Sequence, residues 1–300
     1  MSEEAVTDTS AETKQEAAES AGAEVPRTGL FAFVARYPVT VFLVLTFALQ
    51  IGIVATQYLG IRNYGASALR VFTPALAGVL VAGLAFGKDA AWKCVRSLFD
   101  LKVAPVYWAF ALLYPSFVAV LALGILRAVG AVNEMHFDFQ EAAGWDFFLM
   151  TMKVSASDEL AWISFLLVVL AKRYRLFHAS LIVGLFWGLW YIPLVFADIQ
   201  VVPGLPIAPL LVNFVTIAAI CAWLYLRTGS AAVVFVMQAT TNYTSQIIPV
   251  LPQRGGVPQY VAFVVMKCLF GFALYFLWGP KPLFGKVPAG TSSLDKPAAR

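Results

Sequence analysis

Three charged side chains lie near the middle of long apolar stretches of this 300-residue chain: Asp158, Glu159 and Lys267. A charge at the centre of a membrane helix costs about 2.5–3.5 kcal/mol on insertion scales, so such residues are rare unless they pair or face a polar interior. Carboxylates can exchange protons with a substrate or water, and a nearby cation stabilises their charged form. We therefore expect Lys267 to lie within ion-pair distance of Asp158 or Glu159.

Uncharged polar residues extend the pattern at Tyr191, Gln238 and Asn242. Gln238 and Asn242 are four residues apart, which places both amides on one helix face. At a rise of 1.5 Å per residue, these three residues, Asp158 and Lys267 each lie about 12 to 20 Å inside their apolar stretches. The shared depth favours one buried polar site over the structural alternative, in which the residues only form hydrogen bonds between helices.

The elements that must position these residues are apolar runs of about 20 residues, the length that crosses a bilayer as a helix. The sequence contains eight such runs, at 38–60, 69–87, 104–130, 147–171, 178–197, 206–226, 230–251 and 259–278. Hydrophobic residues make up 60% of the chain and charged residues 13%, whereas soluble domains are near about a half and about a quarter. The predicted fold is an all-α polytopic membrane bundle of about eight transmembrane helices.

The two ends of the chain differ from this bundle in composition. Residues 1–28 are mostly polar, with an excess of acidic over basic side chains and no apolar periodicity, and are expected to form a disordered tail. No signal peptide is expected, because the N-terminal region is acidic and the first apolar run begins only after Pro38, so we expect the first span to remain as an anchor. The membrane bundle is predicted over 29–285, with a C-terminal tail at 286–300.

Basic residues mark alternate connections between the runs. They are frequent at 88–102 and 172–175, whereas the connection at 131–157 is acidic and 198–205 has no Lys or Arg. By the positive-inside rule, both termini are predicted to be cytoplasmic, in a bacterial inner membrane. Three arginines fall on the outer side against the rule: Arg62, Arg70 and Arg254.

The remaining composition limits the partners. The formal net charge of +4 is modest, and the basic residues are explained by topology, so nucleic acid is not an expected partner. The cysteines show no paired spacing, and no cofactor or metal is expected.

We expect membrane lipids around the bundle, with a membrane-protein partner or a lipid-like or prenyl-like ligand. Tryptophans near the polar residues are expected to pack in the core, the alternative being an aromatic-lined ligand cavity.

Over residues 145–250, three segments in order resemble the CPBP family, which covers CAAX prenyl proteases and Abi-type intramembrane peptidases. The family's first motif is Glu-Glu-x-x-x-Arg, and here Asp158, Glu159 and Ile163 stand at those positions. Its second motif ends in a histidine, where this chain has Tyr191 within a Gly-Leu-Trp-Tyr-Ile-Pro stretch that is similar to the family's Gly-Leu-Trp-His-Leu-Pro. The third motif, His-x-x-x-Asn or Asp, corresponds to Gln238 and Asn242.

The resemblance implies an eight-helix fold and a peptidase site in which the first carboxylate and the second-motif histidine activate water, while the third-motif pair stabilises an oxyanion. No metal is implied. Only Glu159 and Asn242 match the motifs. Tyrosine, with an ordinary pKa near about 10, is a poor general base at neutral pH, and Asp158 is one methylene shorter than glutamate. Lys267 is the mid-membrane cation expected to replace the missing arginine, or else faces a wet groove or an interface.

Two hypotheses follow for the function. In the first, the chain is a diverged, non-hydrolytic relative that binds a membrane partner or a lipid-like ligand. In the second, it is an active intramembrane endopeptidase with Asp158 or Glu159 as base and with Tyr191, Gln238 and Asn242 as hydrogen-bond donors. The loss of the arginine and of both histidines favours the first hypothesis.

Overall fold

The computed structural model describes residues 29–60, 69–140, 142–197 and 204–277, and every regular element in these ranges is helical. The predicted tails at 1–28 and 286–300 lie outside the described residues. The helices are α2 (Gly29–Arg36), α3 (Pro38–Tyr58), α5 (Thr73–Phe86), α6 (Lys88–Ser97), α7 (Pro105–Ala128), α8 (Trp145–Asp158), the π-helix η1 (Glu159–Leu167), α9 (Val168–Ala171), α10 (Leu176–Ala197), α11 (Ile207–Thr228), α12 (Ala231–Ile247) and α13 (Val257–Leu277).

Six of the described helices are long and apolar enough to cross a membrane: α3, α7, the continuous α8–η1–α9 helix, α10, α11 and α13. This confirms the all-α polytopic membrane class. The predicted number of about eight spans is higher, because the runs at 69–87 and 230–251 form the shorter helices α5, of 14 residues, and α12, of 17 residues. Helix α12 ends at Ile247, where Pro249 disfavours helical geometry at the preceding residue.

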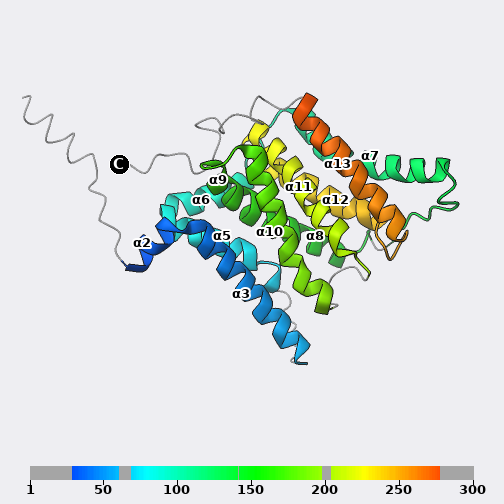
Figure 1. Cartoon of the computed structure of the whole chain (residues 1–300). Helices are drawn as coiled ribbons and strands as arrows, with labels where there is room; N and C mark the ends of the chain where they lie inside the picture. The colour runs from blue at the N-terminus through cyan, green and yellow to red at the C-terminus, as the bar shows by residue number, and fades with distance from the viewer. Residues whose placement is uncertain (1–28, 61–68, 141, 198–203, 278–300) are drawn as a thin grey trace, which may run out of the picture.

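The α8–η1–α9 helix forms the centre of the bundle, and η1 packs against α5, α6, α10, α11 and α12. Residues Ala161 to Leu167 are fully or almost fully buried, because this segment has no polar face to turn outward. Gly78 of α5 allows a close approach, since a methyl group there would come within 3.3 Å of Ala161 Cα. Helix α11 lies between α10 and α13 (Figure 1) and packs against both, whereas α12 packs mainly against α7 and α8.

The segment η1 is a π-helix, in which backbone hydrogen bonds run from residue i to i+5. Such segments are rare and are frequent at functional sites. Here the change from α to π geometry falls between Asp158, the last residue of α8, and Glu159, the first of η1. The unusual backbone therefore begins at the carboxylate pair identified in the sequence.

Candidate functional site

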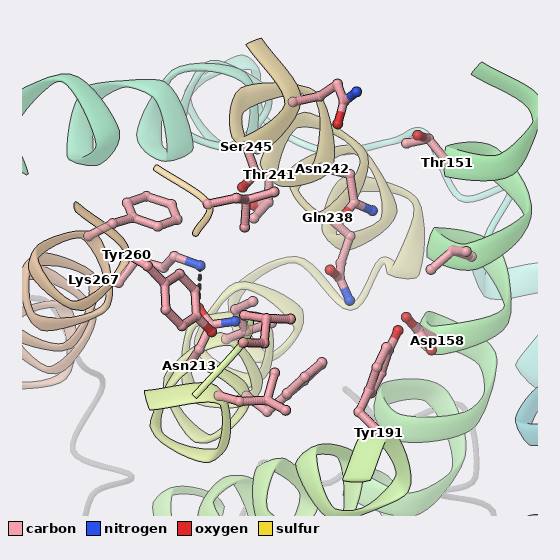
Figure 2. A pocket seen from close by; sticks show the side chains of 18 of the residues that line it. Thr151, Asp158, Tyr191, Asn213, Gln238, Thr241, Asn242, Ser245, Tyr260 and Lys267 are labelled. Carbon is pink, nitrogen blue, oxygen red and sulfur yellow. Dashed lines mark hydrogen bonds between the residues drawn. The ribbon is translucent and has the colours of Figure 1, made fainter. Parts of the chain in front are cut away.

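A cavity of about 320 Å³ lies between α8, α10, α11, α12 and α13. Its wall includes five of the six residues that the sequence selects, namely Asp158, Tyr191, Gln238, Asn242 and Lys267. Figure 2 shows Asp158 and Tyr191 on one side of this cavity and Lys267 on the other. Residues from the three motif segments and Lys267, on four separate helices, thus meet at one place.

Asp158 is the acidic group of the cavity wall and is 5% exposed. The Tyr191 hydroxyl, one helix away on α10, points toward the Asp158 carboxylate (Figure 2). Both groups interact electrostatically with Arg70, which precedes α5 and is also buried. The Arg70 guanidinium lies 5.6 Å from the centre of the Trp190 ring, within the range of a cation–π contact.

Arg70 is the residue of this site that the sequence did not reveal. The sequence predicted only that it lies on the outer side of the membrane, and the structure shows that its side chain is buried against α10. Burial of the guanidinium lowers the pKa of Arg70, and its interactions with Tyr191 and Asp158 raise it. The cation that acts on Asp158 therefore comes from a distant segment of the chain.

Glu159 lies outside the cavity, although it is adjacent to Asp158 in sequence. It is fully buried, and successive residues on a helix point about 100° apart, so Glu159 is turned behind the wall that Asp158 forms. Gln238 and Asp158 are the side chains that act on it electrostatically. Gln238 and Glu159 do not form a hydrogen bond with each other. Both Glu159 carboxylate oxygens and Gln238 Nε2 lack a hydrogen-bond partner among the described residues.

Lys267 does not pair with either carboxylate, and the predicted ion pair is wrong. Its ammonium donates a hydrogen bond of 2.7 Å to Asn213 Oδ1 on α11, and it lies 4.4 Å from the centre of the Phe263 ring. No ion pair between Lys267 and an acidic side chain occurs within the described ranges. The prediction failed because a neutral amide on α11 and an aromatic face on α13 itself meet the ammonium. Asn213 was missed because a single asparagine in an apolar run has no distinctive sequence signal.

Gln238 and Asn242 form the amide side of the cavity, one turn apart on α12. Asn242 Nδ2 donates a long hydrogen bond of 3.5 Å to Ser155 Oγ on α8. Neither amide is held by a short hydrogen bond in the described part of the chain. Amide N–H groups of this kind can polarise a carbonyl group or bind a ligand oxygen.

The tryptophans near the motifs mainly pack in the core. Trp162 and Trp187 stack with ring centres 6.1 Å apart, and Trp162 and Trp190 do not line the cavity. Trp187 does line it, so one of the three indoles contributes to an apolar wall.

Both histidines of the chain lie away from the cavity. His136 is exposed in the connection after α7 and pairs with Glu134 at 3.2 Å, and His178 is exposed near the start of α10. In the ranges that the structure describes, no group of three or more His, Cys, Asp or Glu side chains is placed to hold a metal ion. The chemistry available to the cavity is therefore that of one carboxylate, one ammonium, two phenols, hydroxyls and amides.

Comparisons with known proteins match the part of the chain that carries the three motif segments of this cavity. The family described as type II CAAX prenyl endopeptidase Rce1-like matches residues 140–244. A protein named CAAX prenyl protease 2, from Methanococcus maripaludis, is 33% identical over 107 residues. That alignment covers 34% of this chain and 37% of the relative, so the chain matches little more than a third of the relative's length. These findings confirm the resemblance seen in the three motif segments.

Proposed function

We propose that this chain, in which residues 140–244 match the type II CAAX prenyl endopeptidase Rce1-like family, keeps that family's buried cavity as a binding site without hydrolysing peptide bonds. The ligand is a membrane-derived molecule or a segment of a membrane protein that enters the cavity between α8, α10, α11, α12 and α13. The observation that carries the proposal is the absence of both histidines from the cavity wall.

Water activation in a dry cavity needs a base that can accept a proton and pass it to the leaving amine. Asp158 is the carboxylate on the wall, and the position where the family has a histidine presents the Tyr191 hydroxyl. A phenol donates a hydrogen bond at neutral pH but does not accept a proton readily. General-base assistance typically contributes about 10² to 10⁴-fold to a rate, so its loss alone would slow turnover by about that factor.

The alternative function is an active intramembrane endopeptidase with CAAX-type proteolysis and a rearranged site. One observation favours it: Asp158 shares the cavity with the Gln238 and Asn242 amides. Asp158 would take the proton of a water molecule, and the two amides would stabilise the oxyanion. Glu159 has no such part in either function, because it lies behind the cavity wall.

The deciding experiment is a cleavage assay on the purified full chain in lipid nanodiscs, with prenylated and unmodified peptides that end in a CAAX sequence. A restored variant combines Asp158→Glu, Tyr191→His and Gln238→His, which all change residues of the cavity wall. Ile163 is left unchanged, because it is fully buried and Arg70 already supplies a cation beside Asp158. Gel filtration and thermal unfolding establish that each protein is folded.

We expect no cleavage by the wild-type protein and measurable cleavage by the restored variant. Cleavage by the wild type that is abolished by Asp158→Asn would overturn the proposal in favour of the peptidase. The same assay with Lys153→Met provides a matched control, since this α8 side chain is exposed and does not line the cavity.

The orientation in the membrane is part of the proposal. We place both termini in the cytoplasm of a bacterial cell, on the inner membrane. Figure 1 supports a two-sided bundle, because α2, α6 and α9 gather at one end and the connection that follows α7 lies at the other. The basic residues of α6 and of the turn after α9 are thereby placed together, as the positive-inside rule requires of cytoplasmic segments.

A further inference from the structure

Lys267 lines the cavity from the middle of α13 and is 3% exposed. The only hydrogen-bond partner of its ammonium among the described residues is Asn213 Oδ1, which carries no formal charge. A lysine at this depth is costly to insert unless an anion or a polar interior compensates it. The free-energy cost of burying the Lys267 ammonium is therefore only partly offset by the protein itself.

The two charged sides of the cavity differ in how they are compensated. Asp158 has the Arg70 guanidinium as its electrostatic partner. Lys267 has a neutral amide and the face of Phe263. Figure 2 places Lys267 and Asn213 across the cavity from Asp158 and Tyr191, so the carboxylate does not neutralise the ammonium. A cationic corner remains open to the cavity.

The hydrogen-bonding groups of this corner are donors. An ammonium has three N–H donors and no acceptor, and Asn213 Oδ1 accepts one of them. The same contact fixes the orientation of the amide, because only its oxygen can face an ammonium, and leaves Asn213 Nδ2 to donate elsewhere. Two N–H groups of Lys267 and the Asn213 amide thus suit two oxygens of one anion. A single lysine matches the single charge of a carboxylate.

We propose that Lys267 and Asn213 bind the carboxylate group of the ligand that occupies this cavity. The inference rests on the proposed function in one respect, that a ligand enters the cavity, and it adds the chemical group that the ligand carries. A free carboxylate can belong to the end of a peptide or to a fatty acid, and both present the same two oxygens to this corner.

The experiment measures binding to the full chain in lipid nanodiscs by isothermal titration calorimetry with two pairs of probes. One pair is an N-acetylated leucine-leucine-alanine tripeptide with a free carboxylate, and the same peptide with a C-terminal amide. The other pair is palmitate and hexadecanol. The two probes of each pair differ in whether they carry a carboxylate. The comparison between the two pairs shows whether the carboxylate comes from a peptide or from a fatty acid.

A carboxylate–ammonium hydrogen bond contributes about 1.5–3 kcal/mol, so we expect at least one carboxylate probe to bind the wild type about 10- to 100-fold tighter than its uncharged counterpart. Lys267→Met should abolish this preference, so that the charged and uncharged probes of a pair bind about equally. Asn213→Asp should do the same, because it places a carboxylate of the protein itself beside Lys267, and it does so without leaving a buried charge unpaired. Lys153→Met, on the exposed face of α8, should keep the preference.

Equal binding of charged and uncharged probes by the wild type would overturn the proposal, as would no binding of either carboxylate or a preference that survives in Lys267→Met. The result is independent of hydrolysis. If the wild type cleaves peptides, the non-hydrolytic function fails, while the effect of Lys267→Met on carboxylate preference is still measured with the uncleaved tripeptide or palmitate.

Discussion

Gly184 of α10 lies directly against Val215 of α11, so that a methyl group on Gly184 would come within 2.4 Å of Val215 Cα and 2.7 Å of the Phe214 carbonyl oxygen. Backbones approach this closely in membrane proteins where a glycine removes the side chain between two helices. The contact matters for the cavity, because α10 carries Tyr191 and α11 carries Asn213.

We predict that Gly184→Ala destabilises the protein by about 1–3 kcal/mol, the usual cost of overpacking. The added methyl group meets backbone atoms that cannot move without separating α10 from α11. Thermal unfolding in detergent measures the effect. Gly52→Ala is the matched control, since Gly52 lies within α3 and has no atom within 4 Å of the added methyl group. Equal unfolding temperatures for the two variants would contradict the observed contact.

The interaction between Arg70 and Asp158 predicts non-additive effects of mutation. Removing one member of a buried charge pair typically costs about 3–5 kcal/mol, because the other charge stays buried without compensation. Arg70→Gln and Asp158→Asn should each lower the unfolding temperature. The double variant should be more stable than the sum of the single effects predicts, by about 1 kcal/mol or more.

The control for this cycle pairs Asp158→Asn with Arg127→Gln, at the exposed end of α7. Effects of residues that do not interact should add. Additive effects of Arg70→Gln and Asp158→Asn would show that Arg70 does not compensate the Asp158 carboxylate. The two charged sides of the cavity would then not differ in how they are compensated.

The sequence predicted the position of the site better than its electrostatics. Asp158, Tyr191, Gln238 and Asn242 were found because their polarity is unusual within apolar runs, and helix geometry then gives their depth from residue numbers alone. The partner of Lys267 was predicted from energetic cost alone. That cost requires compensation but does not specify its source, and the structure provides it through Asn213 and Phe263.

Two other features depend on packing that a local pattern does not contain. Arg70 lies between a connection and α5, and its burial depends on contact with Trp190, which is 120 residues away in sequence. The π-helix begins at Glu159 in a run of ordinary helix formers, and no residue of that run distinguishes i+4 from i+5 hydrogen bonding. The first feature supplies the cation that acts on Asp158, and the second begins at the residue that follows it.

The orientation predicts which residues an impermeant thiol reagent can reach in intact cells. We place Glu134 outside and Tyr174 in the cytoplasm, and both side chains are exposed in the structure. In a variant with Cys94, Cys221 and Cys268 replaced by alanine, Glu134→Cys should be labelled in intact cells. Tyr174→Cys should be labelled only after the membrane is permeabilised. The reverse pattern would invert the topology.

Glu159 should respond to substitution in the opposite direction from its neighbour Asp158. Both of its oxygens are buried without a hydrogen-bond partner among the described residues, and an unsatisfied buried polar group costs about 1–3 kcal/mol. Glu159→Met keeps a similar volume and removes this cost, so we expect an unchanged or higher unfolding temperature. Leu160→Met, the next residue of η1, controls for the effect of methionine in this segment. A lower unfolding temperature for Glu159→Met alone would show that the Glu159 carboxyl group has a stabilising partner. Loss of a cleavage activity in Glu159→Gln would assign Glu159 a catalytic role, which its position behind the cavity wall argues against.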